Sequence, residues 1–320
     1  MTTTRPSRVL VVLAFAAVYI IWGSTYLGIR FAIQTLPPFL MAGTRFLIAG
    51  GILFVFAIAK GAPVRQPFTH WRRALIIGGL LLLCGNGGVT WAEKYVASGF
   101  AALLVATEPL WVVVLIWALT HRRPHAKVLL GVLIGLAGVA LLVSDGFGTG
   151  TDGSTLSLIG GGVVLLAGLA WAIGSVYSNR NPISAPTSMV AGMQMLSGGG
   201  LLLLLALATG DVGRLNLQHA SWTSIGAFVY LMLFGSLVGF TAYSFLLSNV
   251  TPESAATYGY VNPVVAVLLS WSIGGEPLTL KMILAAAIIV GSVVLITTYG
   301  REHTAAVAVH DSECPTPPCA

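Results

Sequence analysis

The sequence predicts an all-α membrane protein, with ten transmembrane helices arranged as two inverted repeats of five helices each. Three observations lead to this fold class. Of the 320 residues, 56% are hydrophobic and only 8% are charged, apolar runs recur along the chain, and its second half repeats the first. A soluble domain carries about 25% charged residues because its surface faces water. So few charges indicate a surface that faces lipid instead.

The apolar runs are long enough to cross a bilayer, which takes about 20 mainly apolar residues. We expect spans at residues 9–31, 38–59, 73–92, 98–119, 127–143, 156–178, 187–208, 222–247, 253–273 and 280–298. The first run continues to Ile29, which favours an uncleaved first span over a cleaved signal peptide. The expected units are a first repeat at 1–150, a second repeat at 151–300 and a disordered cytoplasmic tail at 301–320.

Basic residues set the expected orientation, because Lys and Arg are enriched in loops on the cytoplasmic side of a membrane. With the N-terminus inside, most Lys and Arg fall on the inner side, and the outer set is only Arg30, Lys94, Arg214 and Lys281. Both termini are therefore expected in the cytoplasm. The net charge of +6 then reflects orientation rather than nucleic-acid binding, because the basic residues form short clusters between apolar runs.

The repeat is visible as a gap-free match between residues 96–142 and residues 250–296. Its most informative identical pairs are Pro109 with Pro263, Trp117 with Trp271 and Lys127 with Lys281. An odd number of helices in each repeat inverts the second copy in the membrane. Inverted repeats commonly form a binding site near the bilayer midplane, between halves that rock against each other.

Two ionisable residues, Arg45 and Glu108, lie inside expected spans, where a charge costs at least about 2.5–3.5 kcal/mol. One interpretation is an ion pair between them that only fixes helix packing. The other is that Glu108 recognises a solute ammonium group or a proton, with Arg45 as its partner or as an anion contact. The repeat pairs Glu108 with Asn262 and Arg45 with Gln194, so polar residues occupy equivalent places in both halves.

Each of Glu108 and Asn262 directly precedes a proline, Pro109 or Pro263. Proline removes a backbone donor and frees carbonyl groups that can line a cavity. We therefore expect hinges at these two prolines. Two structural kinks inherited from one duplicated ancestor explain the prolines equally well.

Aromatic and amide side chains gather on the same segments. Trp111 is three residues after Glu108, and Tyr258 is four before Asn262, so each pair shares a helix face. The expected solute pathway is Glu108, Arg45, Asn262, Gln194, Asn86, Tyr243, Tyr258, Trp22, Trp111 and Trp171. For any single Trp or Tyr, a place in an interfacial belt or in helix packing is the alternative. Glu93 and Lys94 lie at a helix end and are expected to be structural.

Several motifs are absent from the sequence. It contains no G-x-x-x-x-G-K-[ST] phosphate loop and no H-E-x-x-H metal motif, and all six histidines fall in expected loops or the tail. No Ser–His or paired-Asp arrangement lies within the expected spans. We therefore expect neither an enzyme nor a bound metal or cofactor. An integral membrane enzyme and a non-transporting scaffold or sensor are the alternatives from other functional classes.

Several short segments together resemble the EamA family of the drug/metabolite transporter superfamily, over about residues 8–300. They are Ile21–Tyr26, Pro37–Pro38, Arg45–Phe46, Gly85–Asn86, Trp91–Ala92, Ala101–Leu104 and Glu108–Leu110. The resemblance implies an inner-membrane location and transport, often export, of amino acids, other metabolites or toxic compounds. Gln194 and Asn262 depart from the first half, so the site need not be symmetric in charge.

Together these observations predict a secondary transporter that exports amino acids or related small metabolites by alternating access. Efflux of drugs or toxic compounds is the alternative within the same class. The expected partners are a small-molecule solute and the lipid bilayer, and a homo-oligomer is compatible with the sequence. Glu108 would be the central recognition or proton-coupling group.

Overall fold

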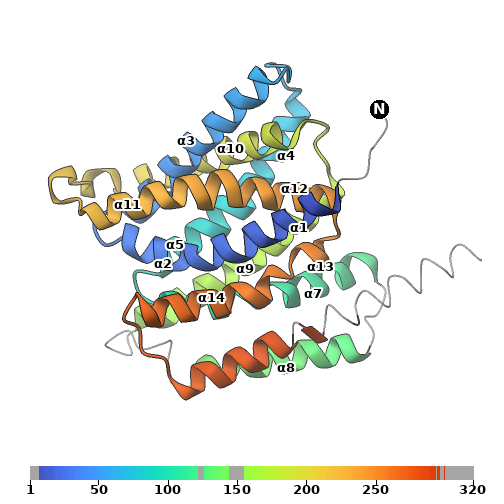
Figure 1. Cartoon of the computed structure of the whole chain (residues 1–320), viewed down its shortest axis with the longest axis vertical. Helices are drawn as coiled ribbons and strands as arrows, with labels where there is room; N and C mark the ends of the chain where they lie inside the picture. Colours follow the sequence, from blue (N-terminus) through green and yellow to red (C-terminus); the bar gives the residue numbers. More distant parts are fainter. Residues whose placement is uncertain (1–6, 122–125, 144–154, 293, 296–298, 300–320) are drawn as a thin grey trace, which may run out of the picture.

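The computed structural model describes residues 7–121, 126–143, 155–292, 294–295 and 299, and within these residues the chain is helical with no strand. The helices lie roughly along one direction and form a single bundle (Figure 1). The predicted tail at 301–320 lies outside the described residues. Arg122 and Arg123, two of the basic residues expected on the inner side, lie outside them as well.

Seven helical stretches are long and apolar enough to cross a membrane. They are Arg8–Ala32, Pro38–Ala59, Phe68–Ala92, Ser98–Thr120, Thr155–Arg180, Thr187–Ala208 and Trp222–Asn249. Three further apolar helices are shorter, namely Ala126–Gly138, Val261–Ser272 and Leu280–Ser292. The helical membrane fold is thus confirmed for the described residues, whereas the count of ten spans stays a prediction.

Four α-helices are unbroken, namely α3 (Pro38–Ala59), α8 (Ala126–Val143), α9 (Thr155–Arg180) and α10 (Thr187–Ala208). The other stretches are composite. Their parts are α1 (Arg8–Ala17), η1 (Val18–Trp22), α2 (Gly23–Ala32), α4 (Phe68–Gly78), η2 (Gly79–Asn86), α5 (Gly87–Ala92), α6 (Ser98–Val105), α7 (Glu108–Thr120), α11 (Trp222–Tyr230), η5 (Leu231–Phe240), α12 (Thr241–Asn249), α13 (Pro252–Ala255) and α14 (Tyr258–Ser272). Two short 3₁₀ turns, η3 (Val212–Arg214) and η4 (Leu217–His219), lie in the connection before α11.

Large apolar side chains cover the outside of the bundle. Examples that are more than half exposed are Val9, Leu133, Leu166, Leu204, Leu207 and Leu268. In water such residues would be driven inside. Their position on the surface fits a protein whose solvent is the hydrocarbon of a bilayer.

A close helix crossing joins α3 and α10, one from each half. A Cβ on Gly50 would lie 3.0 Å from the carbonyl oxygen of Gly192, and a Cβ on Gly199 would lie 3.0 Å from that of Gly43. These contacts pair early residues of one helix with late residues of the other, so the helices cross antiparallel. Small residues allow this approach of backbone to backbone. Because the repeat aligns Gly43 with Gly192, equivalent helices run in opposite directions here.

The first helix of each half also packs on the third helix of the other half. A Cβ on Gly85 in η2 would lie 2.7 Å from the ring of Trp171 in α9, and one on Gly239 in η5 would overlap the indole of Trp22 in η1. Both tryptophans therefore need a glycine opposite them. Three of these elements, η1, η2 and η5, are π-helical. Such segments are rare and frequently mark functional sites.

The fifth helices of the halves pair at the opposite edge of the bundle from α3 and α10. A Cβ on Gly138 in α8 would lie 2.9 Å from Ile288 and Ile289 of the helix Leu280–Ser292. In Figure 1 these two helices form the bottom edge, and α3, α4 and α10 lie at the top. The remaining helices lie between the two edges and enclose the interior.

The α3–α10 crossing predicts different effects for two neighbouring glycines. In Gly50→Ala the new methyl group would lie 2.8 Å from Met195 Cβ and 2.9 Å from the Leu196 nitrogen, whereas at Gly51 it would meet nothing within 4 Å. We expect Gly50→Ala to lower the stability by about 1–3 kcal/mol, as overpacking does, and Gly51→Ala to have little effect. Thermal unfolding of both variants in detergent checks this, and equal melting temperatures would contradict the crossing.

Candidate solute-binding site

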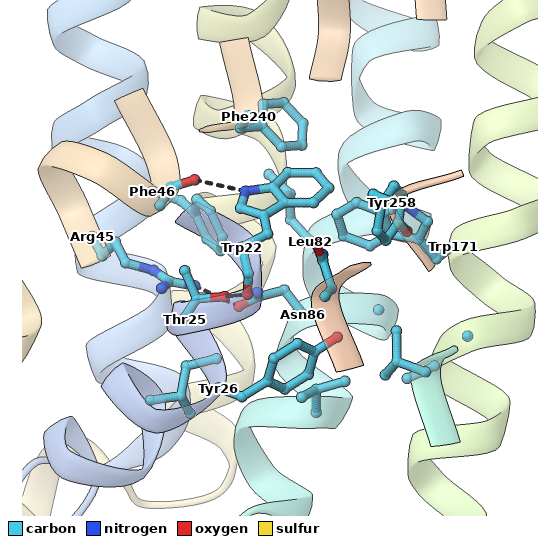
Figure 2. Close-up of a pocket in the computed structure, with 18 residues that line it drawn as sticks. Trp22, Thr25, Tyr26, Arg45, Phe46, Leu82, Asn86, Trp171, Phe240 and Tyr258 are labelled. Atoms are coloured by element: carbon cyan, nitrogen blue, oxygen red, sulfur yellow. Dashed lines mark hydrogen bonds between the residues drawn. The ribbon is translucent and has the colours of Figure 1, made fainter. Parts of the chain in front are cut away.

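A cavity of about 70 Å³ lies between the two halves. It has room for roughly five water molecules, at about 10–15 Å³ each. Its lining includes Trp22, Thr25, Tyr26, Arg45, Phe46, Leu82, Asn86, Trp171, Phe240, Tyr258 and Asn262 (Figure 2). Each π-helical segment ends at one of these residues, η1 at Trp22, η2 at Asn86 and η5 at Phe240. The irregular parts of the helices therefore form the wall of the cavity.

The structure brings six of the ten predicted pathway residues to this cavity, namely Trp22, Arg45, Asn86, Trp171, Tyr258 and Asn262. The other four, Glu108, Trp111, Gln194 and Tyr243, do not line it. Sequence reasoning missed Tyr26 and Phe240, although both carried a signal. Tyr26 is four residues after Trp22 and so shares its helix face, and Phe240 is the repeat counterpart of Asn86.

Three aromatic rings, those of Trp22, Trp171 and Tyr258, form one wall of the cavity, and the ring of Tyr243 packs against them. The ring of Trp22 lies 5.4 Å from that of Trp171, 4.9 Å from that of Tyr243 and 5.5 Å from that of Tyr258, measured between centroids. Tyr243 stands behind this wall, where its hydroxyl accepts a hydrogen bond from Trp171 Nε1 at 3.1 Å and contacts the Ser175 hydroxyl at 2.7 Å. Edge-to-face packing and satisfied polar tips hold these rings in place.

Arg45 reaches the cavity from α3 and is only 2% exposed. Its Nη2 donates to Asn86 Oδ1 at 2.6 Å, and its guanidinium carbon lies 4.4 Å from the centre of the Phe46 ring. Figure 2 shows the guanidinium and the Asn86 amide pointing toward each other. The predicted ion pair with Glu108 is not formed, because each residue is engaged by a partner on a different helix.

Glu108 lies behind Tyr258 rather than in the cavity wall. The Tyr258 hydroxyl donates to Glu108 Oε2, and the other carboxylate oxygen, Oε1, is buried without a partner. Glu108 is the first residue of α7, and Tyr258 is the first residue of α14. A short turn separates each of these helices from the helix before it. Gly259 packs 3.3 Å from Pro109 at the same place, measured from a Cβ built on the glycine. Two broken helices from opposite halves therefore meet at Glu108.

The two predicted hinge prolines occupy different positions. Pro109 lies in the first turn of α7, where its missing N–H costs little, whereas Pro263 lies inside α14. In the first half the helix is interrupted at 106–107, directly before Glu108. In the second half it is interrupted at 256–257, more than a helical turn before Asn262. The two halves therefore differ in where the helix is interrupted relative to its proline.

Gln194 is buried and Trp111 is partly buried, and neither lines the cavity. Gln194 Oε1 accepts a hydrogen bond from the Ser244 hydroxyl at 3.3 Å. Trp111 packs with Val112 and Ala172 between α7 and α9, and its Nε1 has no partner. The repeat counterpart of Arg45 is therefore remote from the cavity, and the site is asymmetric in charge.

One cluster that sequence reasoning missed lies at the end of the bundle where α2 and α14 end. Glu276 accepts hydrogen bonds from the Ser98 nitrogen at 2.9 Å, the Ser98 hydroxyl at 2.7 Å and the Gly99 nitrogen at 3.0 Å. It also forms an ion pair with Arg30 at 2.7 Å. A carboxylate from the second half thus caps the N-terminus of α6 in the first half, where the helix dipole favours negative charge. The only signal in the sequence was a charge in the short turn before Pro277.

Removing this carboxylate predicts a large loss of stability. Glu276→Ala leaves the buried end of α6 and Arg30 without their partner, which typically costs about 3–5 kcal/mol. Glu276→Gln keeps an acceptor oxygen and should cost less. Arg214→Ala is the control, because this side chain is 66% exposed and lies 3.7 Å from Asp211. Thermal unfolding in detergent that ranks Glu276→Ala equal to the control would contradict this account.

Glu93 directly follows the last residue of its span and is buried, and neither of its carboxylate oxygens has a hydrogen-bond partner. Burial raises the pKa of Glu93 well above its ordinary value, and the charge of Glu276 adds to this, while Arg30 and Arg45 oppose it. An unpaired buried carboxylate is costly. Because Glu93 is buried and the charges of Arg30 and Arg45 act on it, it differs from a carboxylate at a solvent-exposed helix end.

The raised pKa predicts how stability depends on pH. Because folded Glu93 holds its proton more tightly than the unfolded chain does, its contribution falls as pH rises from the unfolded pKa of about 4.5 toward the folded one. Each unit of difference corresponds to about 1.4 kcal/mol. We expect Glu93→Gln to stabilise the protein more at pH 8 than at pH 5. Melting temperatures of the native and variant proteins at both pH values check this, and parallel curves would refute it.

Comparison with known proteins agrees with this architecture. Two segments, residues 9–144 and 158–298, match the EamA-like transporter family. The uncharacterized inner membrane transporter YedA of Escherichia coli is 40% identical over 288 residues, which cover 89% of each chain. The uncharacterized transporter YvbV of Bacillus subtilis is 26% identical, over 94% of this chain and 95% of its own.

Two more distant likenesses extend over most of the chain. A WAT1-related chloroplastic protein of Arabidopsis thaliana is 25% identical over 87% of this chain and 67% of its own. A solved protein structure at 23% identity shares the fold, with a TM-score of 0.66 over 92% of this chain and 99% of that one. With two family matches and a relative at 40% identity, the chain belongs to the EamA-like transporter family of membrane proteins.

Proposed function

We propose that this transporter exports amino acids or related small metabolites across the inner membrane by alternating access, with ten spans, two inverted halves and both termini in the cytoplasm. The observation that carries the proposal is the cavity lined by buried polar and aromatic side chains from both halves. Ligand sites of this kind combine apolar walls with a few placed polar groups. A site between inverted repeats is the arrangement from which alternating access follows.

Three observations support the inverted arrangement. Equivalent helices α3 and α10 cross antiparallel through their glycines. Trp22 and Trp171 make reciprocal contacts with the third helix of the opposite half. Two consecutive segments of the chain each match the family. These relations are those expected when one half is an upside-down copy of the other.

Two groups of contacts between the halves support a gating role. At the end of the bundle where α2 and α14 end, Glu276 ties the second half to α6 of the first. In the interior, Glu108 and Tyr258 join the two broken helices. Both links consist of a few hydrogen bonds between the halves. Such bonds can break and reform when the halves move.

Glu108 would act on transport through Tyr258 rather than by touching the solute. As a carboxylate it accepts the Tyr258 hydrogen bond, whereas a protonated Glu108 is a weaker acceptor and has an O–H donor of its own. Tyr258 lines the cavity, so a change in the protonation of Glu108 would alter a hydrogen bond of a side chain in the cavity wall. This assigns Glu108 to proton coupling, one of the two roles expected from sequence.

Efflux of drugs or other toxic compounds is the second candidate, and the aromatic wall of Trp22, Trp171 and Tyr258 favours it. The small cavity favours compact solutes instead. A screen of cells expressing the protein for resistance to amino acids, amino-acid analogues and drugs separates the two. Measured efflux of the protective compound confirms export, and no resistance and no efflux across the panel would contradict it.

With a solute from that screen, Glu108→Gln is expected to abolish concentrative transport or uncouple it from protons. The substitution keeps the size of the side chain and removes its ionisation. Tyr258→Phe is the matched variant, because it removes only the hydroxyl that contacts Glu108 and should weaken coupling in the same direction. Flux into proteoliposomes with and without a pH gradient measures both. Native coupling in folded Glu108→Gln would remove Glu108 from the mechanism.

A further inference from the structure

Arg45 is a buried cation without an anionic partner. It is 2% exposed, and among the described residues no carboxylate lies within 4.0 Å of it. Its hydrogen bonds are limited to Asn86, and its Nε is buried without a partner. A guanidinium has five N–H donors, and buried charges are normally paired. Most of its donors are therefore left for a group that enters the cavity.

Asn86 presents donors to the cavity as well. Its Oδ1 accepts from Arg45 at 2.6 Å and from the Thr90 hydroxyl at 3.3 Å. Because a guanidinium can only donate, this contact fixes the orientation of the amide and turns its NH₂ group away from Arg45. The acceptor of Asn86 is thus occupied and its two donors are free. Arg45 and Asn86 together offer donors and no acceptor, which is the pattern that recognises an anion.

The charge balance limits that anion to one negative charge. Among the described residues, Glu93 is the carboxylate whose field acts on Arg45, and the two are not in contact. A single ligand charge would neutralise Arg45, whereas a phosphate dianion would leave an unpaired charge in an apolar cavity. A ligand cation would face only donors there. The planar fork of a guanidinium matches a carboxylate in particular.

The other residues of the cavity determine what kind of ligand body can pack there. Trp22 and Trp171 form an edge-to-face pair with ring centroids 5.4 Å apart, which offers two apolar ring surfaces at nearly right angles. Asn262 also lines the cavity, and both polar atoms of its amide are buried without a partner. An amide both donates and accepts, so it accommodates a hydroxyl or an amino group at the far end of a ligand, or a water molecule.

We infer that Arg45 and Asn86 anchor the carboxylate of a small organic acid whose body packs on Trp22 and Trp171, and that an amino group on this acid is not required. This rests on the proposed transport function and narrows its substrate class to small monocarboxylates. Amino acids belong to this class as one case. Amines and neutral amides of the same shape are excluded from it.

The test compares three probes that share one body and differ in the head group: phenylpropionate, phenylpropionamide and phenylpropylamine. Isothermal titration of the purified full-length protein in detergent measures their affinities. Charge-assisted bonds to Arg45 should make the acid bind roughly ten- to a hundredfold tighter than the amide or the amine. Equal affinities, a preference for the amine, or no binding of the acid would overturn the inference.

Three variants locate the preference at Arg45. Arg45→Gln should bind the acid and the amide equally, and Arg45→Lys should keep a reduced preference for the acid. Asn86→Asp provides a variant that keeps the fold, because it gives Arg45 a carboxylate partner of the same size. It should lose the preference for the acid. An undiminished preference in Asn86→Asp would overturn the inference even where Arg45→Gln fails to fold.

A purely structural role for Arg45, balancing the charge of Glu93, gives a different pattern. In that case Arg45→Gln combined with Glu93→Gln would regain both the native melting temperature and the native preference for the acid. We expect the double variant to lack that preference whatever its stability. Failure of the proposed function is separate. Acid-selective binding without flux of any solute would contradict transport alone, whereas flux unaffected by Arg45→Gln would contradict the carboxylate anchor alone.

Discussion

The distance between the two halves is set by the crossing of α3 and α10, where backbone meets backbone at glycines. No side chain stands between the helices, so they have little freedom to slide or separate there. Arg45 follows Gly43 by two residues on the same helix. The crossing that joins the halves therefore also determines where the guanidinium meets Asn86. Packing and ligand recognition are coupled through one short stretch of α3.

Two sets of buried polar groups differ in their partners. In a bilayer, polar side chains inside the protein have to be satisfied by other parts of the chain. Tyr243 with Ser175, and Glu276 with Ser98, follow this rule. Arg45 and Asn262 line the cavity and retain unused capacity for hydrogen bonds. The first set holds the fold, and the second is left for what enters the cavity.

Much of the fold could be predicted from the sequence because apolar runs and glycines are local signals. The seven helical stretches that are long and apolar enough to cross a membrane begin and end within about five residues of the predicted spans. The aromatic wall was also predictable, since Trp22 and Trp171 hold equivalent places in the repeat. The partners of Arg45 and Glu108 were not, because they depend on distances between helices that no spacing in the sequence encodes. The role of Glu276 could not be predicted for the same reason, because it caps α6 from a turn far along the chain.

The π-helical segments give the cavity a further property, which concerns register rather than contact. A π-turn holds one residue more than an α-turn, and such an irregularity can move along a helix. Moving it by one position rotates the side chains it passes by about 100°. Trp22, Asn86 and Phe240 each stand at the end of such a segment. The wall of the cavity can thus exchange which side chains it presents while the glycine crossing of α3 and α10 stays in place.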